Sequence, residues 1–216
     1  MFPRVAVQPS MINVAFRLFI KGARILDIEK LREIVGDYQH LRYAKGLFNV
    51  AILHWRTRIN RHSLGAVELP LYCAQVFDSD GQGADYWAAG CPANDSRAEF
   101  WTRRQNCYDL VLDSLSDFED LVKKAATDDL EAVRTHAYAL AFASEDEMFH
   151  STLYDWLIER GLADELLEMR PVYLEAHLRR EPITVQKYQL LWQFYVKDGQ
   201  PLRAAEVLGA LAESTE

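Results

Sequence analysis

The last third of this 216-residue chain constrains the fold most, because it consists of short amphipathic segments in direct succession. Apolar residues recur there at helical spacing, and residues that start or stop helices separate the segments. Nothing in this third has the alternating pattern of a strand. Several helices of two to four turns, joined by short connections, form antiparallel pairs that stack. The sequence therefore predicts an all-α fold, an α-solenoid of stacked antiparallel helix pairs.

Helix ends are marked in this region by capping residues. Ser144 followed by Glu147 predicts a capping box, in which each side chain satisfies an otherwise unpaired backbone amide. Gly161 can take the left-handed conformation that ends such a helix. Pro171 suits the first turn of the next helix, where its missing amide is not needed, and Pro201 suits the first turn of the last one. The spacing of these signals predicts helices of a few turns each.

Three apolar faces are expected to point into the stack. They comprise Phe149, Leu153, Trp156 and Leu157; Val185, Tyr188, Leu191, Trp192 and Tyr195; and Ala204, Ala205, Leu208, Leu211 and Ala212. The dipeptide at 198–199, Asp-Gly, ends the second face. Small residues on the third face allow backbones to approach closely. Trp156 and Trp192 are interpreted as core anchors.

The whole chain divides into three parts of one continuous helical domain. Residues 1–60 are expected to form N-terminal helices of the solenoid segment, at 10–26, 28–40 and 43–59. Residues 61–95 are predicted to be an irregular, loop-rich connection, because the periodicity fades and Gly, Asp and Ser accumulate. Residues 96–216 are predicted to be the C-terminal solenoid helices, beginning with helices over 96–126 and 128–141.

Aromatic residues in the 61–95 connection allow two interpretations. They are Tyr72, Phe77, Tyr86 and Trp87. These rings could form a binding loop, or they could fold back and cap the helical stack. The nearby acids Asp78, Asp80 and Asp85 do not make a calcium loop, because the glycine is misplaced and the closing glutamate is absent.

Composition limits the class of protein. Half of the residues are hydrophobic, which argues against global disorder. No apolar run approaches the roughly 20 residues that span a bilayer, and no signal-peptide pattern opens the chain. Cys73, Cys91 and Cys107 are odd in number and widely spaced, so free thiols in a reducing compartment are expected.

Charge is distributed unevenly within the net charge of −8. Residues 1–60 carry 10 Lys/Arg and 4 Asp/Glu, whereas residues 61–216 carry 14 and 28. The basic end could meet an acidic partner or nucleic acid, or it could be ordinary solvated helix faces. Since no aromatic platform interleaves with the basic residues, nucleic acid is not an expected partner.

No pattern in the sequence predicts an enzyme. Glu147 and His150 form one half of a di-iron motif, and the second half is missing. His150 and His177 are interpreted as structural residues at helix interfaces, although His177 could titrate near neutral pH. The cysteines lack zinc-site spacing, and nothing positions Cys107 beside a histidine as a nucleophile. We therefore expect no catalytic, cofactor-binding or metal-binding residues, no cofactor and no small-molecule substrate.

Three ordered segments carry a resemblance to a known family. They are residues 153–167, 173–180 and 190–214. The first contains an aromatic-x-Trp-Leu-Ile helix and a Gly-Leu-Ala-Asp turn. The second contains a Leu-Glu-x-His-Leu helix, and the third a Leu-Leu-Trp-x-aromatic-Tyr helix. The matching positions include Trp156, Gly161, Asp164, His177, Trp192 and Tyr195. This block resembles the C-terminal α-helical region of the large inner-ring scaffold nucleoporins, the vertebrate one-fifty-five and fungal one-seventy class.

The resemblance implies a function as well as a fold. It implies a structural scaffold component of the nuclear pore complex inner ring, at the nuclear envelope, that binds linear motifs of disordered linker nucleoporins and supports nucleocytoplasmic transport. It also implies that the chain is a fragment of a longer protein. The partner-binding residues are not assigned by these motifs. The alternative is a helical-repeat adaptor or coat-type interaction module outside the pore.

Overall fold

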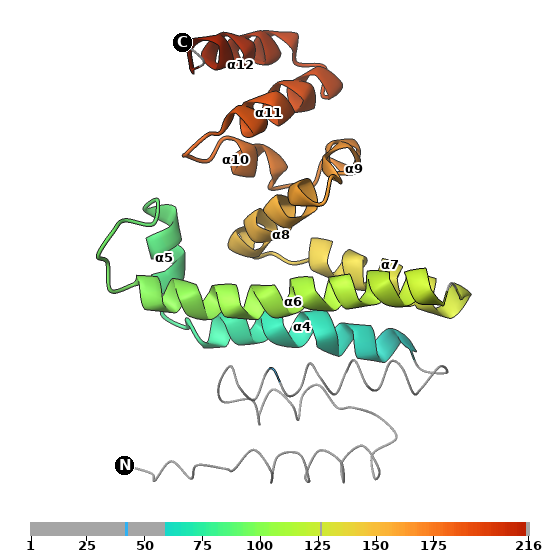
Figure 1. The fold of residues 1–216 in the computed structure, drawn as a ribbon. Helices are drawn as coiled ribbons and strands as arrows, with labels where there is room; N and C mark the ends of the chain where they lie inside the picture. Colours follow the sequence, from blue (N-terminus) through green and yellow to red (C-terminus); the bar gives the residue numbers. More distant parts are fainter. Residues whose placement is uncertain (1–41, 43–58, 126, 215–216) are drawn as a thin grey trace, which may run out of the picture.

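The computed structural model describes residue 42, residues 59–125 and residues 127–214 of the chain (Figure 1). The helices expected at 10–26, 28–40 and 43–59 lie outside the described residues, apart from residue 59 itself. Over the described ranges the chain is helical and contains no strand, which confirms the all-α class. The helices are α4 (Ile59–Val76), α5 (Gln82–Ala88), α6 (Ala98–Lys124), α7 (Asp128–Phe142), α8 (Glu147–Glu159), α9 (Ala163–Met169), α10 (Leu174–Leu178), α11 (Val185–Lys197) and α12 (Pro201–Ser214).

The helices stack in one direction, from α4 at one end of the described part to α12 at the other (Figure 1). A lower layer is formed by α4, α5, α6 and α7, in which α4 packs on both α6 and α7 and α5 packs on α6. An upper layer is formed by α8 to α12, in which α9 packs on α8 and α11, and α11 packs on α12. The two layers meet mainly where α8 crosses α6. One apolar core runs through both layers.

The expectation of an irregular connection over 61–95 is wrong for most of its length, because α4 and α5 lie there. A broad face of α4 is buried: Gly65, Ala66, Val67, Leu69, Pro70, Cys73 and Ala74. The exposed positions near its end, Tyr72, Gln75 and Val76, carry no charge, so this part of α4 lacks the charged face that marks an amphipathic helix in a sequence. Pro70 lies inside α4 and reads in the sequence as a helix breaker.

The helices expected over 96–126 and 128–141 are confirmed as α6 and α7. One face of α6 points into the core. Cys107, Leu110, Val111, Leu115 and Phe118 are buried, whereas Phe100, Leu121 and Val122 are partly buried. The Thr127 hydroxyl accepts a hydrogen bond from the amide of Leu130 and begins α7.

The start of α8 differs from the predicted capping box. Asp146 is the N-cap residue, and one of its carboxylate oxygens accepts hydrogen bonds from the amides of Met148 and Phe149. The Ser144 hydroxyl instead accepts from the amide of Asp146. The predicted end is confirmed, since Gly161 has a φ of +78° and its amide donates to the carbonyl of Ile158.

Two details of the last helices also differ from expectation. Pro171 lies in a turn before α10, which begins only at Leu174. On α12 the expected inward face is split: Ala204 is buried and Leu211 partly buried, whereas Ala205, Leu208 and Ala212 are exposed. Only α11 packs closely on α12 among the described helices, so one side of α12 remains uncovered.

The predicted core tryptophans lie at the edge of the core. Trp156 and Trp192 are only partly buried, and Trp156 stacks under the guanidinium of Arg160 at 4.3 Å from its ring centre. On α11, Leu191 and Tyr195 are buried as predicted, while Val185 is 48% exposed. Phe149, Leu153 and Leu157 of α8 are buried as predicted.

Candidate functional site

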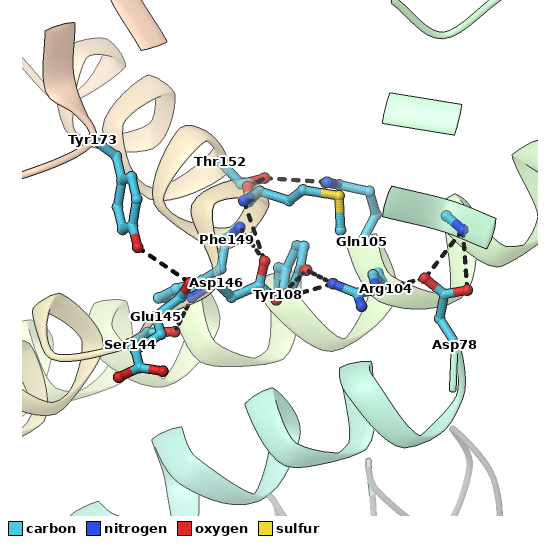
Figure 2. A network of polar contacts seen from close by, with 12 residues as sticks. Asp78, Arg104, Gln105, Tyr108, Ser144, Glu145, Asp146, Phe149, Thr152 and Tyr173 are labelled. Carbon is cyan, nitrogen blue, oxygen red and sulfur yellow. Dashed lines mark hydrogen bonds and ion pairs between the residues drawn. The ribbon is translucent and has the colours of Figure 1, made fainter. Parts of the chain in front are cut away.

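A buried polar network joins the two layers (Figure 2). Asp78, in the turn between α4 and α5, accepts hydrogen bonds from the amide of Gly83 at 3.0 and 3.1 Å and from Arg104 Nε at 2.8 Å. Arg104 Nη1 lies 3.2 Å from Asp146 Oδ2. The Tyr108 hydroxyl donates to that same oxygen at 2.6 Å. Each of these side chains thus has an opposite charge or a hydrogen-bond partner, as buried polar groups require.

The network is suited to holding helices rather than to proton transfer. Burial, followed by the neighbouring charge of Asp146, raises the pKa of the Tyr108 hydroxyl far above its ordinary value. Burial alone would lower the pKa of Arg104, but Tyr108, Asp146 and Asp78 raise it overall. At neutral pH both groups therefore stay protonated, and each serves as a hydrogen-bond donor: Tyr108 to Asp146, and Arg104 to Asp146 and Asp78.

His150 and His177 lie at the interface between α8 and its neighbours. His150 Nε2 lies 2.7 Å from the carbonyl oxygen of Ser144, and the His150 ring packs near the ring of Tyr173, at 5.0 Å between centres. His177 Nδ1 lies 2.7 Å from the hydroxyl of Ser151. Its other nitrogen lies 3.1 Å from Asp155 Oδ1, without the angle of a hydrogen bond. These contacts attach α10 and the segment before it to α8.

Neither histidine belongs to a metal site in the described part of the chain. Glu147 is exposed while His150 is buried, so the two residues of the half motif do not converge. Residues 59–125 and 127–214 contain no group of three or more His, Cys, Asp or Glu side chains placed to hold a metal ion. Among the same residues, no helix is both long and apolar enough to cross a membrane.

The cysteines are free thiols, as expected. Cys73 and Cys107 are buried and Cys91 is exposed. Burial first, and then the neighbouring Cys73, raises the pKa of the Cys107 thiol to about 12. Since the thiolate is the nucleophile, Cys107 is not a candidate for nucleophilic chemistry at neutral pH.

The aromatic residues of 61–95 pack rather than form a loop. Tyr86 is buried, and Phe77 and Trp87 pack against the core. The guanidinium of Arg180 lies over the Trp87 ring, 3.4 Å from its centre, and ties the upper layer to α5. Of these four residues, only Tyr72 is exposed, with 38% of its surface accessible. Three of the four rings therefore pack against the core instead of lining an exposed loop.

Two hollows in the described surface could receive a partner. The first, which we call the α5–α8 cavity, has a volume of about 420 Å³ and is lined by Gln75, Ala84, Asp85, Trp87, Ala88, Arg104, Glu145, Asp146, Glu147 and Met148. The second, which we call the α7–α9 groove, has a volume of about 340 Å³ and is lined by Tyr138, Ala139, Phe142, Leu157, Leu162, Glu165 and Met169. The first is polar and charged, whereas the second is almost entirely apolar. The sequence placed Gln75, Ala84, Asp85, Trp87 and Ala88 in the predicted irregular connection. For the lining residues that it placed in helices, periodicity gave no sign that neighbouring elements leave them uncovered.

Comparison with known proteins places this architecture in a family. The profile of the family described as "Non-repetitive/WGA-negative nucleoporin C-terminal" matches residues 56–216. The chain belongs to this nucleoporin family. Nucleoporin NUP170 of Chaetomium thermophilum is 36% identical over 217 residues, which cover 96% of this chain and 14% of the relative. A probable nucleoporin of Schizosaccharomyces pombe is 31% identical over 206 residues, which cover 95% of this chain and 14% of the relative.

Solved structures of this nucleoporin family have the same fold. A crystal structure of the Nup170 CTD of Chaetomium thermophilum superposes with a TM-score of 0.65 at 26% identity, covering 94% of this chain and 36% of that one. A crystal structure of the Nup170 CTD–Nup145N complex from the same organism gives a TM-score of 0.66 at 26% identity, covering 94% and 37%. The predicted α-solenoid is thereby confirmed.

Membership in this nucleoporin family also decides between the two functional classes. The curated relatives are nucleoporins, so the chain is placed at the nuclear pore complex of the nuclear envelope. They are structural proteins, which confirms the expectation that the chain is not an enzyme. The family assignment favours the pore over an adaptor or coat-type module elsewhere. The chain spans about a seventh of the length of these relatives.

Proposed function

We propose that this chain is a scaffold segment of the inner ring of the nuclear pore complex. It binds a short linear segment of another nucleoporin and so helps to hold the ring together for nucleocytoplasmic transport. One observation carries the proposal: the chain shares its fold with the Nup170 CTD over 94% of its length, and that relative has been solved as a Nup170 CTD–Nup145N complex.

The physical character of the described surface supports a binding role. A solenoid spreads its core along one axis and leaves long lateral surfaces for partners. The buried charges of the network are paired with one another, so they stabilise the stack rather than carry out a reaction. The two hollows are of the size that receives a few side chains. Each such contact can be weak, since tethering raises the effective concentration of a second site.

Isothermal titration calorimetry tests this proposal. The full chain is titrated with the Nup145N chain of the solved complex, which we call the Nup145N probe. We expect saturable binding with a Kd below about 100 µM, which corresponds to a binding free energy more favourable than about −5.5 kcal/mol. A scrambled probe of identical composition is the control for attraction by charge alone. If the probe and its scrambled version give the same heats, the proposed binding function is wrong.

A further inference from the structure

The α7–α9 groove lies at the seam between the two layers of the solenoid. On one side α7 packs against α4 and α6, and on the other α9 packs against α8 and α11. Leu157 of α8, 4% exposed, lines the groove between them. The hollow therefore arises from the way the layers diverge, and its walls stand on helices held by other contacts.

Below its rim, the groove presents apolar surface, and none of its described lining residues carries a buried polar group without a partner. The Tyr138 hydroxyl donates to Glu119, so only its ring is left for the groove. Phe142 stacks on Tyr154 with ring centres 6.5 Å apart, which holds its ring in place. Met169, at the opposite wall, is 54% exposed. An unbranched thioether adapts its shape to an incoming side chain.

The α5–α8 cavity offers a poorer floor for an apolar occupant. Its lining includes Arg104 and Asp146, the charged pair of the buried network, together with the exposed acids Asp85 and Glu147. Covering that surface would remove charged groups from water with no new partner, which is unfavourable. The groove has a single charged residue among its lining residues, Glu165. Of the two hollows, the groove is thus the one where burying apolar side chains is favourable.

The rim of the groove is acidic. Glu165 and its neighbour Asp164 stand in the first turn of α9, and neither has a side-chain hydrogen bond or ion pair to another residue of the described ranges. The cations nearby already have partners: Arg160 pairs with Glu119, Arg170 with Asp198, and Lys197 with Glu168. A partner that brings a positive charge to this rim therefore finds an unpaired carboxylate. The same charge disfavours nucleic acid and anionic lipid.

The size of the groove limits what it can hold. Its volume of about 340 Å³ is at the lower end of the roughly 300–1,000 Å³ range of ligand pockets. It can take a few large side chains of a peptide, and it cannot take a folded domain.

We infer that the α7–α9 groove is the binding site for a short nucleoporin segment that presents large apolar side chains beside a Lys or Arg. This inference rests on the proposed function and specifies its site and its partner chemistry. The apolar side chains lie against Leu157, Phe142 and Met169, and the basic side chain pairs with Glu165 at the rim. This is the groove mode of peptide recognition, in which apolar anchors supply affinity and a rim charge sets orientation.

Two matched substitutions separate the groove from the cavity. Ala139→Glu introduces a carboxylate into the groove, and Ala88→Glu introduces the same group into the α5–α8 cavity. Both alanines are exposed on helices of the folded chain. In titrations with the Nup145N probe we expect Ala139→Glu to weaken binding by about tenfold or more, as central interface positions do. Ala88→Glu should stay within about twofold of wild type. The reverse order would place the site in the cavity and overturn the inference.

A charge reversal at the rim provides a second arm. Glu165→Lys should weaken binding by about threefold or more at low salt, and its affinity should depend less on salt than that of wild type. Thermal melts verify that each variant is folded. If wild type does not bind the Nup145N probe, the proposed function and this inference fail together. If wild type binds and neither Ala139→Glu nor Glu165→Lys changes the Kd, the inference alone is wrong.

Discussion

Arg104 on α6 and Asp146 at the start of α8 lie 3.2 Å apart, although 42 positions separate them in the chain. The same carboxylate accepts the Tyr108 hydroxyl at 2.6 Å and caps the first turn of α8. One side chain thus begins a helix and attaches it to the layer below. Leu157, on the same helix, lines the α7–α9 groove.

Removal of the Asp146 carboxylate should destabilise the fold strongly. Asp146→Ala deletes the cap and leaves the buried Arg104 without one of its anions, for which we expect a loss of about 3–5 kcal/mol in the free energy of unfolding. Asp146→Asn keeps a capping oxygen and should lose less. Chemical denaturation measures both, with Glu99→Ala as the control, since the exposed Arg103–Glu99 pair is worth at most about 0.5 kcal/mol. Equal effects of Asp146→Ala and Glu99→Ala would contradict the role of the network.

Replacement by alanine should have opposite effects on stability at two glycines, because α5 packs tightly on α6 at Gly83, whereas Gly209 on α12 has open space around it. A Cβ at Gly83 would lie 2.9 Å from the backbone nitrogen of Trp101 and 2.9 Å from Asp78 Oδ2. Gly83→Ala should therefore cost about 1–3 kcal/mol. At Gly209, exposed on α12, a Cβ meets nothing within 4 Å, so Gly209→Ala should stabilise the chain by up to about 1 kcal/mol. Chemical denaturation should give a lower midpoint for Gly83→Ala and a higher one for Gly209→Ala. Shifts of both midpoints in the same direction would contradict the packing described.

Thiol reactivity should divide the cysteines. In the folded chain, a thiol reagent such as dithionitrobenzoate should react quickly with the exposed Cys91 and only slowly with the buried Cys73 and Cys107. The pKa of about 12 at Cys107 adds to its protection, because little thiolate is present. Mass spectrometry locates the label, and denaturant should release the other two. Rapid native labelling of Cys107 would show that α4 and α6 do not pack as described.

Burial of His150 predicts a dependence of stability on pH. Burial lowers the pKa of this imidazole, against smaller opposing effects of the Ser144 carbonyl and the Asp146 charge. The unfolded chain, with a histidine pKa of about 6.5, therefore binds a proton that the folded chain does not. The free energy of unfolding should fall as pH drops below about 6.5 until the lower folded pKa is passed. His150→Gln should show a smaller fall between about pH 7.5 and 5.5; an unchanged fall would contradict the burial.

The sequence was sufficient for the helices that keep one polar face. α6, α7 and α8 carry an apolar stripe and clear end signals, so their existence and approximate bounds could be predicted. α4 escaped prediction because it packs on both α6 and α7 with a broad apolar face, and its exposed positions Tyr72, Gln75 and Val76 carry no charge. The start of α8 was misplaced because Ser144 and Asp146 are both good cap residues, and only the tertiary contact with Arg104 selects Asp146.

The candidate site was less accessible from the sequence for a geometric reason. Phe142, Leu157 and Met169 each lie in a helical segment, and periodicity treats every apolar residue as core. Whether such a residue is covered depends on how α7 and α9 diverge, which no local pattern encodes. The same limit explains Ala205 and Leu208, which were expected inside and are exposed on α12.

Methyl NMR of the methionines tests the central claim most directly, because it needs no substitution. Met169 lines the α7–α9 groove and Met148 lines the α5–α8 cavity. On titration of the ¹³C-methyl-labelled chain with the Nup145N probe, the account predicts that the Met169 signal shifts or broadens while the Met148 signal stays in place. A Met148 shift with an unmoved Met169 signal at saturation would contradict it.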